Sequence, residues 1–309
     1  MNTRFSSRIF ITAILLLCST LFANAQPEGR ENFDAHWKFH LGDIPDAQST
    51  GFADNSWRSL NLPHDWSIEG AFSPDNPSGY SGGALPGGIG WYRKTFRLPA
   101  ADRHKKISIE FDGVYMNSKV WINGHYLGNR PYGYSTFFYD LSPYLQNGDN
   151  VIAVQVDNSV QPNSRWYSGS GIYRHVWLIR SDDIHIAHWG TYITTPEVSA
   201  SRASVKAVTT VKNGTMQPAK VMLVSTIIND KGQRVATQKS TMDIPADSSL
   251  DFNADLHVTN PALWETTHPR LYRLLSEVYQ GNKLLDTYTT TFGIRHFHFD
   301  SDKGFFLNG

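Results

Sequence analysis

Cysteine is almost missing from this sequence of 309 residues, in which Cys18 is the only one. A single thiol forms no disulfide within one chain, so the fold must rely on its hydrophobic cores. Net charge is missing too, because 28 Lys and Arg residues balance 28 Asp and Glu residues. This balance argues against binding to nucleic acid or to an anionic membrane surface, and we expect an uncharged partner.

Several common catalytic and metal-binding motifs are also absent. The sequence has no Gly-rich phosphate loop, no Cys-based metal site, no G-x-S-x-G elbow and no H-E-x-x-H pair. His296 and His298 alternate so that two imidazoles lie on one face of a strand, but no third ligand is indicated nearby. We therefore expect a structural role for them, and we assign no metal and no cofactor from the sequence.

The first 25 residues have the pattern of an export signal. A positive region, a short apolar run and a small-residue cleavage site follow one another: Arg4 with Arg8, Ile9 to Leu17, and Ala23-Asn24-Ala25. The apolar run is too short to span a bilayer. We expect a periplasmic or secreted protein that is not membrane-bound after cleavage. A lipid anchor on Cys18 is less favoured, because bulky Leu17 precedes that residue.

The remaining sequence predicts an all-β protein. Apolar and polar residues alternate with period two, and no stretch keeps an apolar period of 3.6 residues. Turn residues separate the expected strands, and Asn123-Gly124 is a strong hairpin signal. Strands are expected at 107–111, 119–121, 125–127, 151–156 and 172–179. Short strands at this spacing are typical of a β-sandwich or jelly roll.

The composition changes near Ser181-Asp182-Asp183, where aromatic residues become fewer and Val, Thr and Ala become more common. Roughly seven short strands in about 110 residues fit an immunoglobulin-like sandwich. Strands are expected at 204–211, 220–228, 250–258, 274–279 and 284–292. The predicted organisation is a signal peptide at 1–25, a jelly roll at 26–181, an immunoglobulin-like domain at 182–292 and a closing segment at 293–309.

The closing segment ends in a strand, a turn, a second strand and then Asn308-Gly309, which starts another turn. Asn-Gly suits hairpin turns because both residues tolerate positive φ. We therefore expect a further strand to follow Gly309.

Two stretches are rich in residues that recognise sugars. Residues 165–174 follow Asp157-Asn158-Ser159 and combine aromatic rings, which stack on sugar C–H surfaces, with polar groups that bind hydroxyls. A loop that only connects strands is the alternative. The glycine-rich stretch 76–93 is a long irregular loop, which either overhangs a site or is simply flexible.

Six motifs in sequence order resemble glycoside hydrolase family 2, and they span nearly all of the chain after residue 25. The motifs are Leu62-Pro63-His64-Asp65-Trp66, residues 90–96, residues 111–114, residues 120–124, residues 164–167 with 171–174, and residues 292–295. The resemblance looks closest to exported bacterial β-galactosidases.

The resemblance implies a jelly-roll sugar-binding domain, an immunoglobulin-like sandwich and then a (β/α)8 barrel with two catalytic glutamates. Retaining enzymes of this kind need two carboxyls about 5–5.5 Å apart. The family's acid/base glutamate follows an asparagine, and these 309 residues contain no Asn-Glu pair. We therefore expect the catalytic residues beyond Gly309, residues 293–309 as the lead-in to the barrel, and no activity from this chain alone. The resemblance leaves Mg²⁺ or Na⁺ in the barrel open.

In related enzymes the first domain contributes a wall of the sugar pocket. The segment at Asp157 corresponds by position to one that donates a polar residue to the pocket, and Trp166 matches a tryptophan just after it. The substrate-binding candidates are Asp157, Asn158, Arg165 and Trp166.

The preferred hypothesis is the non-catalytic N-terminal part of a retaining exo-glycosidase, a β-galactosidase of carbohydrate metabolism. Its partner would be a β-galactoside or a related oligosaccharide. The alternatives are the same part of a β-glucuronidase or β-mannosidase, a free-standing carbohydrate-binding module, and a structural or assembly fragment. Homo-oligomerisation through the full-length enzyme stays open.

Overall fold

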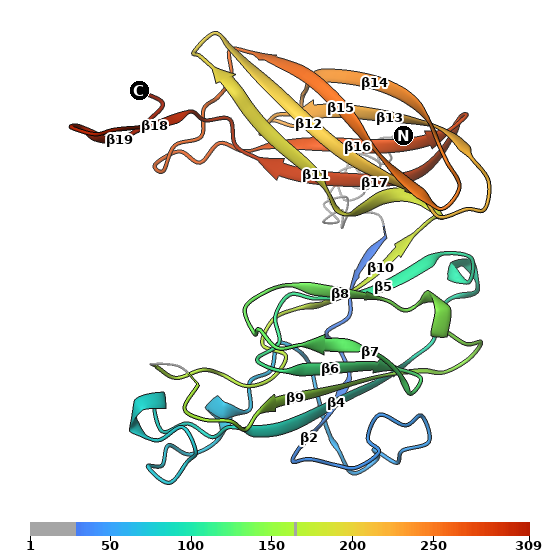
Figure 1. Cartoon of the computed structure of the whole chain (residues 1–309), viewed down its shortest axis with the longest axis vertical. Helices are drawn as coiled ribbons and strands as arrows, with labels where there is room; N and C mark the ends of the chain where they lie inside the picture. The colour runs from blue at the N-terminus through green and yellow to red at the C-terminus, as the bar shows by residue number, and fades with distance from the viewer. Residues whose placement is uncertain (1–28, 164–165) are drawn as a thin grey trace, which may run out of the picture.

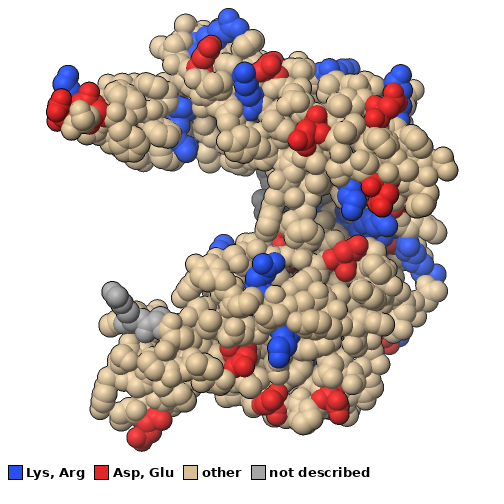
Figure 2. All heavy atoms as spheres, viewed as in Figure 1, with Lys and Arg blue, Asp and Glu red and all other residues tan. Residues whose placement is uncertain are grey.

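The computed structural model describes residues 29–163 and 166–309, and the chain forms two β-sandwiches followed by a small hairpin (Figure 1). The predicted signal peptide and Arg165 lie outside these residues. No α-helix occurs in the described ranges, which confirms the all-β prediction. In space-filling view the two sandwiches form the arms of a C, and the charged side chains on this face are scattered and mixed in sign (Figure 2).

The first sandwich consists of two antiparallel sheets. One sheet has the order β3-β2-β4-β9-β6-β7, and the other has the order β1-β10-β5-β8. The strands of the first sheet are β3 (Arg58–Leu60), β2 (Trp37–Leu41), β4 (Gly88–Phe96), β9 (Asn150–Asn158), β6 (Ser118–Ile122) and β7 (His125–Arg130); those of the second are β1 (Arg30–Asn32), β10 (Val176–Ser181), β5 (Lys106–Phe111) and β8 (Phe137–Asp140). Four short 3₁₀ turns, η1 (Ser67–Glu69), η2 (Tyr80–Gly82), η3 (Ala100–Asp102) and η4 (Ser142–Tyr144), connect them.

Alternation along the strands builds the core of this sandwich. Ile107, Ile109 and Phe111 of β5 point inward, and the ring of Phe111 stacks on Phe137 at 5.1 Å. Each fully buried side chain of this kind contributes about 1.5–3 kcal/mol. The six-stranded sheet has a second apolar layer on its outer face, where Trp91 packs with Trp57, while its neighbour Tyr92 enters the main core.

The second sandwich has seven strands, as an immunoglobulin-like domain requires. A three-stranded sheet has the order β11-β12-β15, and a four-stranded sheet has the order β14-β13-β16-β17. Their bounds are β11 (Ile184–Val198), β12 (Arg202–Asn213), β15 (Ser248–Thr259), β14 (Arg234–Ile244), β13 (Ala219–Ile228), β16 (Tyr272–Gln280) and β17 (Lys283–Phe292). In β15 the residues Phe252, Ala254, Leu256 and Val258 are buried and those between them are exposed.

The closing segment forms the predicted hairpin of β18 (Phe297–Asp300) and β19 (Gly304–Leu307). Asn308 and Gly309 both have positive φ, as the Asn-Gly turn signal predicts. The Asn308 amide donates to the Trp264 carbonyl at 3.1 Å and so ties the hairpin to the second sandwich.

One strand prediction was too long. We expected a strand at 172–179, whereas β10 begins at Val176. The residues before it belong to a loop with its own partners: the Ile172 carbonyl accepts from the His64 N–H at 2.8 Å, and Gly171 pairs with Tyr115. Those bonds keep Ile172 out of the sheet, although its side chain is fully buried.

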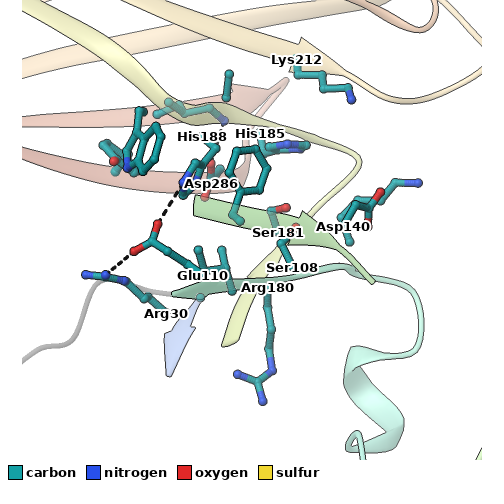
Figure 3. A pocket seen from close by; sticks show the side chains of 18 of the residues that line it. Arg30, Ser108, Glu110, Asp140, Arg180, Ser181, His185, His188, Lys212 and Asp286 are labelled. Atoms are coloured by element: carbon teal, nitrogen blue, oxygen red, sulfur yellow. Dashed lines mark hydrogen bonds and ion pairs between the residues drawn. The ribbon is translucent and has the colours of Figure 1, made fainter. Parts of the chain in front are cut away.

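The junction of the two sandwiches is built around a β-bulge in β11, between Ile186 and Thr191. The bulge places the His188 ring 3.9 Å from the Phe138 ring, and His188 Nε2 lies 2.9 Å from the Glu110 carboxylate. The other Glu110 oxygen pairs with Arg30 at 2.5 Å (Figure 3). Burial acts to raise the pKa of Glu110, but His188 and Arg30 outweigh it and the pKa is lowered.

Within the described ranges no helix is long and apolar enough to cross a membrane.

Candidate functional site

Strand pairing brings the two sugar-type stretches of the sequence together. β4 pairs antiparallel with β9, so that Gly88 lies opposite Asn158 and Ile89 lies opposite Asp157. The glycine-rich loop leads into the start of β4, next to the end of β9, on the left of the lower domain in Figure 1. The loop before β4 and the loop after β9 therefore lie at the same end of these two paired strands.

Side chains near η1 join these two loops. The Ser67 hydroxyl donates to the Pro86 carbonyl at 2.6 Å and lies 2.7 Å from the Ser170 hydroxyl. At Gly83 the glycine-rich loop is so close to Tyr167 that a Cβ there would lie 2.9 Å from the Tyr167 Cβ. The glycine-rich stretch is thus packed against the second loop, which favours its interpretation as part of a site.

Asp157 lies at the end of β9 and is half-buried. Its Oδ1 accepts hydrogen bonds from the Ser159 N–H at 3.0 Å and the Ser159 hydroxyl at 2.6 Å. Within the described part of the chain, Oδ2 has no hydrogen-bond partner. The carboxylate is therefore held in place by one oxygen and has the other available for a ligand hydroxyl.

Asn158 has a different position from the one expected of a ligand contact. Its side chain is 1% exposed. The amide N–H₂ donates to the Ser170 hydroxyl at 2.7 Å, and the amide oxygen accepts from Gln161 at 2.8 Å and from Asn163 at 2.5 Å. Asn158 is therefore buried and hydrogen-bonded to residues of the loop after β9, and it supports that loop.

Trp166 and Tyr167 are the exposed part of this loop. Trp166 is 70% exposed and Tyr167 is 52% exposed, with ring centroids 6.5 Å apart. Arg165, the remaining candidate, lies outside the described residues. Two exposed aromatic rings in the loop that follows β9, and a carboxylate at the end of β9, are the residue types that stack on a sugar ring and bind its hydroxyls.

Sequence reasoning did not assign a role to Asp65, which the structure places beneath this loop. Its Oδ1 accepts from the Ser170 N–H at 2.7 Å and from the Ser67 N–H at 2.9 Å. Asp65 therefore fixes the turn that precedes Gly171. Its place in the Leu62 to Trp66 motif was the only signal in the sequence.

The neighbouring His64 is buried, and its Nδ1 lies 2.7 Å from the Tyr92 hydroxyl. Burial lowers the pKa of His64. At the surface side of this group, the hydrogen bond from Arg58 lowers the pKa of Glu69 to about 2. This network is a structural support below the loops.

Sequence reasoning also missed a group of four tyrosines, Tyr115, Tyr132, Tyr134 and Tyr173, which we call the tyrosine strip. Tyr132 and Tyr134 lie in the loop from β7 to β8 and are 62% and 59% exposed. Their rings form a T-shaped pair with centroids 5.8 Å apart. The closely spaced aromatic residues at 132 and 134 were the available signal.

A cavity of about 530 Å³ lies at the junction of the two sandwiches and is lined by β5, β10, β11 and β17 among others (Figure 3). Its volume is that of a small-molecule site. Its central acidic group, Glu110, is already paired with Arg30 and His188. We assign this cavity to the domain junction.

In the described ranges, no group of three or more His, Cys, Asp or Glu side chains is arranged to hold a metal ion. His298, considered for such a role in the sequence, stacks on Phe306 with ring centroids 4.7 Å apart.

Comparison with known proteins gives the following similarities. Residues 31–182 match the sugar binding domain of the glycosyl hydrolases family 2, and residues 184–295 match a second domain of the glycosyl hydrolases family 2. Beta-galactosidase BoGH2A from Bacteroides ovatus is 52% identical over 284 residues, which is 92% of this chain and 33% of that relative.

A putative beta-glucuronidase from Formosa agariphila is 39% identical over 296 residues, which is 96% of this chain and 28% of the relative. A solved structure of a family 2 glycosyl hydrolase from Bacteroides cellulosilyticus superposes with a TM-score of 0.88 at 37% identity, over 91% of this chain and 37% of that one. The chain thus spans about a third of the length of these relatives.

Proposed function

Because the chain belongs to glycoside hydrolase family 2, we propose that it is the sugar-recognising N-terminal part of a retaining exo-glycosidase that hydrolyses O-glycosyl bonds. The preferred substrate class is the β-galactosides, which is supported by the 52% identity to a protein named beta-galactosidase. The first sandwich would shape the sugar pocket, and the second would connect it to the catalytic part of the protein.

The observation that carries this proposal is the pair of loops that lie before β4 and after β9, at the same end of these strands. They present Trp166, Tyr167 and one oxygen of Asp157 on the domain that matches the family's sugar binding domain. Aromatic faces with one carboxylate suit an uncharged polyhydroxyl ligand. Asn158 and Asp65 would act as positioning residues, since both are bound to the loop that carries Trp166.

The chemical step is proposed to belong to another part of the protein. A retaining glycosidase needs two carboxyls about 5–5.5 Å apart, one as nucleophile and one as acid/base. Two carboxylates bond to this part of the domain and have structural roles. Asp65 accepts hydrogen bonds from the Ser170 and Ser67 N–H groups, and Asp157 accepts one from the Ser159 N–H. A barrel with two glutamates would supply the pair, and Mg²⁺ or Na⁺ in that barrel belongs to the same proposal.

A β-glucuronidase is the second candidate, because a protein named putative beta-glucuronidase is 39% identical over 96% of this chain. A glucuronide carries a carboxylate, so a cationic side chain at the pocket would favour it. Galactosides are preferred because the relative named beta-galactosidase has the higher identity, 52% against 39%.

Two assays test this function. The protein from the complete reading frame should hydrolyse p-nitrophenyl β-galactoside with retention and should act much more slowly on the β-glucuronide, whereas the 309-residue chain alone should hydrolyse neither. Preference for the glucuronide would make the second candidate correct. Turnover by the 309-residue chain would contradict the proposed division of labour.

We also propose export to the periplasm or the cell exterior, which rests on the sequence pattern of residues 1–25. N-terminal sequencing of the protein recovered from the producing cells tests this, with Gln26 as the expected first residue. A mature chain that begins at Met1 would contradict export.

A further inference from the structure

We propose that the tyrosine strip is a glycan-binding site that holds the sugar units beyond the one that enters the pocket. This inference rests on the proposed function, because it names the substrate class as oligosaccharides rather than simple galactosides. Its residues are Tyr115, Tyr132, Tyr134 and Tyr173.

The sheet topology puts the strip beside the candidate pocket. β7 and β9 both pair antiparallel with β6, so they run parallel to each other. The C-terminal ends of β7 and β9 therefore lie at the same end of the sheet (Figure 1). The loop with Tyr132 and Tyr134 follows β7, and the loop with Trp166 follows β9.

A direct contact joins the loop that carries Trp166 to the base of the tyrosine strip. The Tyr115 hydroxyl donates to the Asn163 side-chain oxygen at 3.3 Å. The same oxygen accepts from the Ser168 hydroxyl at 3.1 Å. Asn163 and Ser168 flank Trp166 in the sequence, so the loop that carries Trp166 is hydrogen-bonded to Tyr115 of the strip.

The strip is built on a fixed base. The Tyr134 ring packs against Tyr115 at 5.1 Å and against Tyr173 at 6.4 Å, both in T-shaped geometry. Tyr115 is 6% exposed, and the Tyr173 hydroxyl donates to the Gly133 carbonyl at 2.8 Å. The buried Tyr115 and the half-buried Tyr173 thus hold the Tyr134 ring in place, and Tyr134 contacts Tyr132. A ring that is held before any ligand arrives lowers the entropy cost of binding.

The chemistry of the strip suits an uncharged glycan. Burial and the neighbouring tyrosines raise the pKa of Tyr134, which favours the uncharged form of its hydroxyl. The exposed rings of Tyr132 and Tyr134 combine apolar faces with hydroxyls, and amphipathic rings of this kind match the C–H faces and hydroxyls of sugars. The strip also lies within residues 31–182, which match the sugar binding domain.

Titration calorimetry on the 309-residue chain tests the proposal, with β-1,4-linked galactotetraose and methyl β-galactoside as probes. Loss of one stacking ring should weaken binding of the tetraose by about twofold to tenfold. Tyr134→Ala is therefore expected to raise the Kd for galactotetraose by that factor, and Tyr134→Phe should keep most of the affinity. Neither change should alter the Kd for methyl β-galactoside, which is too short to reach the strip.

Tyr126→Ala is the matched control, since Tyr126 is 53% exposed near the other end of β7, beside Trp121. It should leave both affinities unchanged, and thermal unfolding checks that all variants are folded. Equal tetraose affinities in wild type and Tyr134→Ala would overturn the proposal, as would the absence of tetraose binding.

Failure of this inference can be separated from failure of the proposed function. Hydrolysis of p-nitrophenyl β-galactoside by the complete protein does not require the strip. If that substrate is hydrolysed while tetraose binding is independent of Tyr134, the strip alone is rejected. If the tetraose binds through Tyr134 and no β-glycoside is hydrolysed, the proposed function alone is rejected.

Discussion

At the scale of single residues, the structure separates side chains that hold the candidate site from side chains that are free to touch a ligand. The sequence identified a polar and aromatic segment around residues 157–167, but residue type alone did not separate these roles. Asp157 and Asn158 are neighbours on a strand, so their side chains point to opposite faces. Among the described residues Asp157 accepts hydrogen bonds through Oδ1 alone, and Asn158 is buried with its amide bonded. Val154 and Val156 lie on the same buried face as Asn158, so the alternation along the strand indicates the buried side chain, which residue type alone does not.

Arg93 is a buried charge whose removal would leave its hydrogen-bond partners unpaired. It is 1% exposed, its Nε donates to Asp54 at 2.9 Å, and its Nη1 donates to the carbonyls of Ala47 and Ser49. Arg93→Ala would strand Asp54 and two carbonyls. We expect the free energy of unfolding, measured with urea at pH 7, to fall by about 3–5 kcal/mol.

The matched control for this change is Arg97→Ala on the residue just after β4. Arg97 also pairs with an aspartate, Asp149, but its side chain is 73% exposed. Water replaces that pair easily, so little change in stability is expected. Similar losses in the two variants would show that burial of Arg93 is not what makes its pair important.

At the scale of secondary-structure elements, the strands that the sequence predicted correctly are those with a buried apolar face. β15 and β13 belong to this group, and the turn at Asn123-Gly124 has the positive φ values that its sequence predicts. β14 was not predicted, because it is an edge strand whose burial pattern leaves almost every residue exposed or half-buried. Its hydrogen bonds to β13 come from the backbone, which leaves no mark in the side-chain pattern.

β11 was missed for a different reason. It contains 15 residues, and the bulge between Ile186 and Thr191 interrupts its alternation. A bulge shifts the side chains that follow it to the opposite face, so a period-two pattern no longer spans the strand. The same bulge carries His188 to Glu110 at the domain junction. The bulge that interrupts the alternation in β11 thus also places a contact between the two sandwiches, from His188 to Glu110.

At the scale of the whole molecule, the family resemblance proposed from six motifs is confirmed, and so is the order of a jelly-roll sandwich followed by an immunoglobulin-like sandwich. The adjacency of the glycine-rich loop, the Trp166 loop and the tyrosine strip was not predictable from spacing. It follows from antiparallel pairing of β4 with β9 and of β6 with its two neighbours, and such pairings join residues far apart in the sequence. The proposed role of the first sandwich in sugar recognition depends on that adjacency.

The most direct test of this role is the kcat/KM of the complete protein for p-nitrophenyl β-galactoside, with and without Asp157→Ala. Loss of a hydrogen bond to a charged group costs about 1.5–3 kcal/mol, so kcat/KM should fall by roughly tenfold to a hundredfold. Asp157→Asn controls for the loop, because it keeps an oxygen for Ser159, and Asp149→Ala controls for loss of an exposed carboxylate elsewhere. An unchanged kcat/KM in Asp157→Ala would contradict the account, because the first sandwich would then contribute no such contact to the sugar.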